Sequence, residues 1–171
     1  MDTIPQLVDR IVNRHHAYVR TAGPAITVRL AKLRAKHGAE HLELAEIDAT
    51  FAALRAELDQ HMFKEERILF PYVCDLAEHA GACGQMRSPF GTVENPIRMM
   101  EHEHDNALSA LARIRELTNN FATPADVCKG WALGMEELEA FARDLVEHIT
   151  LENTVLFPAA IALEKSLSVA T

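Results

Sequence analysis

The stretch His61-Met-Phe-Lys-Glu65-Glu-Arg-Ile-Leu-Phe-Pro71 decides the fold of this chain. Eighty-seven residues later it recurs as His148-Ile-Thr-Leu-Glu152-Asn-Thr-Val-Leu-Phe-Pro158, so both copies read His-x-x-x-Glu-x-x-(Ile/Val)-Leu-Phe-Pro. A frame of this length is not expected twice by chance in a chain of 171 residues. We therefore interpret the two copies as an internal repeat.

The spacing of the histidine and the glutamate gives the repeat a chemical meaning. Positions i and i+4 of an α-helix lie on one face, so His61 and Glu65 can point inward together, as can His148 and Glu152. Imidazole and carboxylate form a mixed ligand set that suits iron, zinc or manganese. One copy alone would be read as a surface ion pair. Two copies, each followed by the same apolar anchor, favour one shared metal site.

The composition limits the classes of protein to consider. A chain of 171 residues is expected to form a single domain, residues 1–171, and 6% aromatic residues with seven glycines favour helix over sheet. The net charge of −8 argues against nucleic acid or anionic lipid as the main partner. No stretch is apolar enough to span a membrane. No signal peptide is recognisable, and three cysteines without a CxxC pair indicate the reducing cytoplasm.

Apolar periodicity and turn residues divide the chain into helices. We expect helical runs over residues 3–22 and 25–37, separated by a break or kink at Gly23-Pro24, with Gly38 as C-cap. A long helix is expected over 42–80, a loop over 81–94 and a third helix over 96–117 with Asn95 as N-cap. The last helix is expected to begin at Thr123-Pro124. Pro71 and Pro158 predict matching kinks, and the whole pattern predicts an all-α, up-down-up-down four-helix bundle.

The repeat predicts one further ligand from each of the other two helices. His16 precedes His61 by 45 residues and His104 precedes His148 by 44, so these two histidines obey the repeat best. His15 and His102 point in other directions on a helix, and we expect both to be surface histidines.

His37 is a candidate for a fifth nitrogen ligand. On a straight helix it lies about 31 Å from His16, so only a sharp reversal at Gly23-Pro24 would bring both into one site. A histidine on the surface at the helix end is the favoured alternative.

Four histidines and two glutamates exceed the needs of one tetrahedral zinc ion and suit two metal ions a few Å apart. Iron is the best match for this mixed set with open coordination positions. Glu57, Asp144 and Glu103 are candidates for hydrogen bonds to the ligands or for proton transfer, with exposed helix acids as the alternative.

The paired motifs resemble the hemerythrin-like (HHE cation-binding) domain, and most closely the repair-of-iron-centres di-iron proteins. Matching segments also surround Arg14-His15-His16 and Glu103-His104-Asp105. The resemblance implies two iron ions bridged by Glu65 and Glu152, with or without an oxo or hydroxo bridge. It implies terminal ligation by the four repeat-related histidines, namely His16, His61, His104 and His148.

The resemblance also implies a function. The family is implicated in repairing iron–sulfur clusters damaged by nitric oxide or oxidants, through iron donation or nitric oxide chemistry, with apo iron–sulfur proteins as partners. The alternative is reversible binding or sensing of oxygen or nitric oxide, and a weaker alternative is an enzyme that handles peroxide. Acidic residues near the ligands favour redox or proton-coupled chemistry over an oxygen store.

Overall fold

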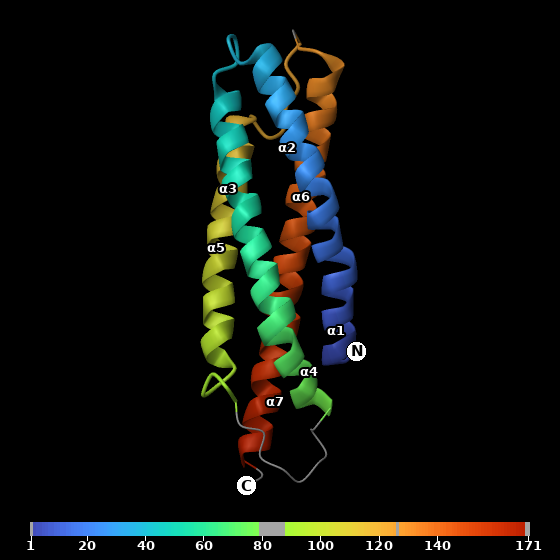
Figure 1. Cartoon of the computed structure of the whole chain (residues 1–171), viewed down its shortest axis with the longest axis vertical. Coiled ribbons are helices and arrows are strands. Elements are labelled where there is room, and N and C mark those ends of the chain that lie inside the picture. The colour runs from blue at the N-terminus through green and yellow to red at the C-terminus, as the bar shows by residue number, and fades with distance from the viewer. Residues whose placement is uncertain (1, 79–87, 126, 170–171) are drawn as a thin grey trace.

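The structure is a computed structural model that describes residues 2–78, 88–125 and 127–169. Its described residues form four long helical segments and contain no β-strand, and neighbouring segments run in opposite directions (Figure 1). The predicted all-α, up-down-up-down bundle is therefore confirmed. No helix in these ranges is long and apolar enough to cross a membrane.

The first segment is one continuous rod made of α1 (Ile4–Arg10), a π-helical turn η1 (Ile11–His16) and α2 (Ala17–His37). The expected break at Gly23-Pro24 is wrong, because Pro24 lies inside α2. Gly23 is buried, and a Cβ atom there would lie 3.0 Å from Cδ of Arg55. The glycine therefore allows close packing against α3 instead of ending the helix. Gly38 is the C-cap, as predicted.

The second and fourth segments share one design, in agreement with the repeat. The second consists of α3 (Glu43–Lys64), η2 (Glu65–Leu69) and α4 (Phe70–Glu78). The fourth consists of α6 (Lys129–Leu151), η3 (Glu152–Leu156) and α7 (Phe157–Val169). A π-helical turn thus stands in each copy where a proline kink was expected, just before Pro71 and Pro158. Such turns are rare and concentrate at functional sites.

Two predicted helix starts are wrong. The third segment, α5 (Glu94–Leu117), begins after Val93, because the Glu164 carboxylate accepts hydrogen bonds of 2.9 and 3.0 Å from the Val93 N–H. Asn95 is already helical and donates to the Phe90 carbonyl instead. Helix α6 begins after Cys128, several residues beyond Thr123. Of the expected loop over 81–94, residues 81–87 lie outside the described part of the chain, as do residues 79 and 80 at the end of the expected helix over 42–80.

The core consists of two apolar clusters with a polar layer between them. The larger cluster is built from α2, α3, α5 and α6 and centres on Phe51 and Phe141. The smaller cluster is built from α1, η1, α4, the start of α5 and α7. Each long segment passes from one cluster to the other, and the side chains at the crossing are histidines and glutamates. The bundle therefore places its buried polar residues in one layer.

Candidate metal centre

The polar layer contains all six residues that the sequence predicted as metal ligands. The side chains are nearly inaccessible to solvent, and both carboxylates have no exposed area. They form two groups of four, and within each group one ligand atom per residue lies within 4.8 Å of the others. The first group is His16, Glu65, His148 and Glu152, and the second is His61, Glu65, His104 and Glu152.

Local helix geometry places the ligands at one level. His61 and His148 lie one turn before the π-helical turns η2 and η3, which begin at Glu65 and Glu152. His16 is the last residue of η1. Three of the four segments thus carry a π-helical turn at the level of the centre. The i, i+4 spacing read from the sequence is what brings each histidine to its glutamate.

In the first half of the centre, two imidazoles and two carboxylates converge. The Nε2 atoms of His16 and His148 lie 3.2 Å apart. His16 Nε2 lies 3.3 Å from Glu65 Oε2, and His148 Nε2 lies 3.0 Å from Glu152 Oε1.

The second half repeats this arrangement with the other oxygen of each carboxylate. The Nε2 atoms of His61 and His104 lie 3.1 Å apart. His61 Nε2 lies 3.3 Å from Glu65 Oε1, and His104 Nε2 lies 3.0 Å from Glu152 Oε2. Each glutamate therefore presents one oxygen to each half, which is the geometry of a bridging carboxylate.

The donor set fits a pair of cations. Both carboxylate oxygens of Glu65 are fully buried and have no hydrogen-bond partner among the residues that the structure describes. A buried anion without a donor is strongly unfavourable unless a cation compensates it. Imidazole nitrogens and shared carboxylates together are the ligands of borderline divalent metals. The interior of this bundle is consequently built to hold metal.

The outer nitrogens of three of the imidazoles are fixed by hydrogen-bond partners. Nδ1 of His16 lies 2.7 Å from Glu66, Nδ1 of His61 lies 2.9 Å from Glu103, and Nδ1 of His104 lies 2.8 Å from Asn153. Such partners set the tautomer and orientation of a ligand imidazole. Glu103 was a sequence candidate for this role, whereas Glu66 and Asn153 were missed.

Basic side chains near the surface hold two of these partners. Arg20 donates to Glu66 at 2.7 Å, and Lys64 pairs with Glu103. Although partial burial opposes it, the hydrogen bonds from His16 and Arg20 lower the pKa of Glu66, and those from Lys64 and His61 lower the pKa of Glu103. Both carboxylates therefore stay ionised, and each can accept a hydrogen bond from the Nδ1–H of its imidazole.

In the absence of metal, the buried histidines and glutamates of the centre shift one another's pKa values. Burial would lower the pKa of His61, but Glu65, Glu152 and Glu103 raise it to about 9. Burial would raise the pKa of Glu152, yet His148 and His104 hold it well below its usual range. Without metal, anionic carboxylates are thus balanced by imidazolium. A metal ion must displace the imidazolium proton when it binds.

The remaining candidates lie elsewhere. His15 is buried with 2% exposure, so its expected surface position is wrong. His102 is exposed. His37, at the end of α2, lies 3.2 Å from Cys128 Sγ and packs against Trp131, and it belongs to neither group of four. Because α2 is continuous, the reversal that would bring His37 to the centre does not occur.

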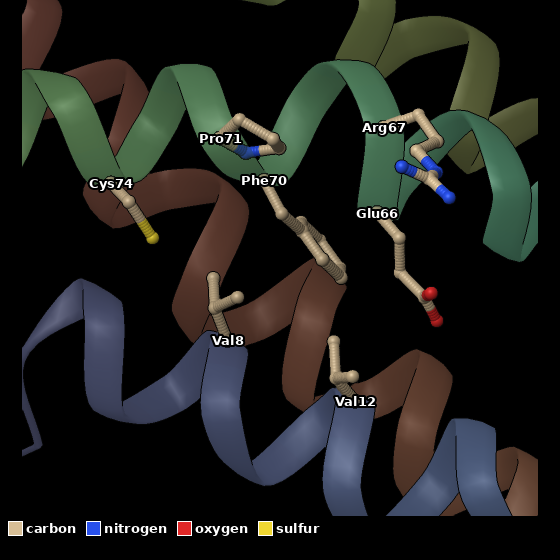
Figure 2. Close-up of a pocket in the computed structure, with 7 residues that line it drawn as sticks. All are labelled: Val8, Val12, Glu66, Arg67, Phe70, Pro71 and Cys74. Carbon is tan, nitrogen blue, oxygen red and sulfur yellow. The ribbon is translucent and has the colours of Figure 1, made fainter.

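A groove of about 460 Å³ lies beside the first half of the centre, the half that contains His16. Figure 2 shows Val8 and Val12 facing Phe70 across this groove, with Glu66 at one end and Cys74 at the other. The Phe70 ring stacks on His16, with ring centroids 5.9 Å apart. The groove is therefore separated from a predicted ligand by one apolar ring.

Fold and site together define a helical-bundle protein with a buried metal-binding centre. The profile of the Hemerythrin HHE cation binding domain matches residues 7–160, and the chain belongs to this family.

Similar proteins carry names that refer to one process. The chain is 36% identical over 160 residues to "Iron-sulfur cluster repair protein YtfE" of Musicola paradisiaca. The matched region covers 94% of this chain and 65% of that protein. It is 33% identical to the protein of that name in Escherichia coli O157:H7, with 94% and 68% covered. It is also 33% identical to a "Probable iron-sulfur cluster repair protein" of Haemophilus influenzae, with 91% and 65% covered. The chain thus spans about two thirds of the length of these relatives.

Proposed function

We propose that this chain is a non-haem di-iron protein that acts in the repair of iron–sulfur clusters damaged by nitric oxide or oxidants. The observation that carries the proposal is the sharing of Glu65 and Glu152 between two His-containing groups. Two metal ions would each receive two imidazoles and one oxygen from each carboxylate. The proposed iron ligands are His16, His61, Glu65, His104, His148 and Glu152.

The names of the relatives support the repair role. Since the chain spans only part of their length, we propose the role for this chain as the metal-binding part of that activity, with residues 1–171 forming one domain. The partners would be apo iron–sulfur proteins, and the small ligand would be nitric oxide or oxygen. Cys74 and Cys128 are free thiols, which fits work in the reducing cytoplasm.

The residues around the centre have separable tasks in this proposal. Bound iron would supply redox chemistry and open coordination positions for a small molecule. The bundle excludes water from the centre, because both carboxylates and all four imidazoles are buried. The Glu66 and Glu103 carboxylates orient the imidazoles of His16 and His61. Each carboxylate can share the Nδ1 proton of its imidazole. Arg20 and Lys64 keep these two carboxylates ionised and in place.

The first experiment measures metal content and iron transfer. Wild type and Glu65→Ala/Glu152→Ala are purified without chelator and analysed for iron and zinc. The matched control is Glu57→Gln, because Glu57 is exposed and occupies the position in the first repeat that Asp144 occupies in the second. We expect two irons per wild-type and control chain, and loss of both in the double variant. The iron-loaded protein is then mixed with an apo iron–sulfur protein and sulfide, and cluster formation is followed by absorbance.

Two results would overturn the proposal. Zinc alone, or one metal per chain, contradicts the di-iron centre. Two irons that stay bound in the presence of the acceptor, together with a stable nitric oxide or oxygen adduct, favour the alternative of a reversible binding or sensing protein. Val8, Val12 and Phe70 give the groove beside His16 an apolar lining, and this supports that alternative, since uncharged diatomic molecules partition into apolar surroundings.

A further inference from the structure

Beside the centre, the described residues contain a third group of side chains with ligand geometry. His15 comes from η1, and Asp144 and Glu147 lie one turn apart on α6. One ligand atom from each lies within 4.8 Å of the others. This group was not predicted from the sequence, because His15 was expected at the surface.

The group is partly built into the protein interior. His15 has 2% exposure, and its Nδ1 lies 3.1 Å from Asp144 Oδ1. The second oxygen, Asp144 Oδ2, is buried and has no hydrogen-bond partner in the described part of the chain. Buried carboxylate oxygens normally find a donor or a cation. Here one oxygen has neither, next to a buried imidazole.

The outer side of the group is open. The Glu147 side chain is 54% exposed and pairs with exposed Arg14 at 2.9 Å. Exposed ion pairs contribute little, so Arg14 can release Glu147 without a large cost. A cation could therefore approach from solvent and keep water ligands on this side.

The group lies directly against one half of the centre. The ring of His15 stacks on the ring of His148, with centroids 5.4 Å apart and planes 8° apart. His148 is also the one ligand histidine whose Nδ1 is buried without a hydrogen-bond partner among the described residues. Within the described ranges, the repeat does not reproduce this arrangement on the other half. Glu57 stands at the position of Asp144, but it is exposed and belongs to no such group.

We propose that His15, Asp144 and Glu147 form a third cation site for a divalent metal such as Fe²⁺ or Mn²⁺. One imidazole and two carboxylates, completed by water, suit these ions better than a four-coordinate zinc ion. The site would bind more weakly than the centre, because it has fewer protein ligands and is open to solvent. A further role as the place where iron enters or leaves the centre rests on the proposed function.

The test counts metal ions beyond those in the loaded centre. Iron-loaded protein is titrated with Mn²⁺, and free Mn²⁺ is followed by electron paramagnetic resonance. We expect one additional Mn²⁺ per wild-type chain. Glu147→Gln, at a half-exposed position that leaves the fold intact, should weaken this binding about tenfold or more. Asp144→Asn/Glu147→Gln should abolish it with the iron content unchanged, and Glu57→Gln should behave as wild type.

The outcomes separate the new site from the proposed function. Absence of additional Mn²⁺ in wild type, or unchanged Mn²⁺ binding in Glu147→Gln, overturns the third site whatever the repair assay shows. Additional Mn²⁺ that depends on Glu147 supports the third site even if no iron reaches an apo acceptor. For the transit role, we expect slower release of iron to a chelator in Glu147→Gln than in Glu57→Gln, and equal rates overturn it.

Discussion

Glu65 and Glu152 bring carboxylate oxygens within 4.8 Å of each other in both halves of the buried centre. Each carboxylate directs one oxygen to each half, so Glu65 contacts His16 with Oε2 and His61 with Oε1. Two buried carboxylates so close together repel one another unless cations or protons lie between them. Their juxtaposition brings the four histidines around one pair of shared carboxylates.

Removing a shared carboxylate should affect both metal ions, whereas removing a histidine should affect mainly one. We expect Glu65→Gln to lose most of both irons and His104→Gln to keep about one, because His104 belongs to the second half only. Elemental analysis after desalting measures the difference. Two irons retained by Glu65→Gln would contradict the bridging role.

The contribution of His61 to the stability of the metal-free protein should fall as the pH rises between about 6.5 and 9. The pKa of His61 is raised from about 6.5 in the unfolded chain to about 9 in the folded protein, so the folded state binds the proton more tightly. This contribution is complete below pH 6.5 and is lost as the pH rises through 9.

Thermal unfolding midpoints of the metal-free protein across this interval provide the measurement. The carboxylates of the centre do not contribute to this slope, because the pKa values of Glu65 and Glu152 are lowered and both stay ionised. The difference in stability between wild type and His61→Gln isolates the His61 contribution and should shrink as the pH rises. A slope as steep in His61→Gln as in wild type would refute the assignment.

The carboxylate of Glu103 should tune the affinity for metal without being a ligand. It lies 2.9 Å from His61 Nδ1 and is partly exposed. Glu103→Gln should therefore weaken metal binding by about 10–100-fold, because the outer partner sets the orientation and basicity of the imidazole. Competition with a chelator measures the affinity. Exposed His102→Gln, one residue away, should change nothing, and equal effects of both variants would contradict this role.

Cys128 should be the more reactive of the two cysteines in the described ranges. Its thiol lies 3.2 Å from His37 Nε2 at the start of α6, and this hydrogen bond lowers the pKa of Cys128 to about 7. Burial raises the pKa of Cys74. Alkylation by iodoacetamide, read by peptide mass spectrometry, should label Cys128 with half-maximal rate near pH 7.

The control for this prediction is His37→Gln. It should slow the labelling of Cys128 at pH 7 and leave that of Cys74 unchanged. Equal labelling rates of the two cysteines in wild type would show that the His37 contact does not activate the thiol.

The apolar core should carry much of the folding energy of the bundle. Phe51 has no exposed area and packs edge-on against Phe141, with ring centroids 5.2 Å apart. Phe51→Ala should lower the free energy of unfolding by about 3–5 kcal/mol, as for other buried phenylalanines. Urea denaturation of the metal-free protein measures this change. Exposed Phe63→Ala is the control and should cost far less.

The sequence by itself determined the helical class, the bundle and the six residues of the polar layer. The reason is local, because a helix fixes which residues share a face, so the His-x-x-x-Glu spacing already joins His61 to Glu65 and His148 to Glu152. The repeat then selected His16 and His104. None of these inferences depends on how one helix packs against another.

Only the tertiary structure decided the surroundings of the centre. Whether Pro24 interrupts a helix depends on packing, and here α2 continues through Pro24 with buried Gly23 close to Arg55. The continuous helix places His37 beside Cys128. His15 is buried because η1 and α6 meet at His148, a contact between residues 133 positions apart. Contacts of this kind are set by the fit of whole helices, which no local spacing in the sequence records.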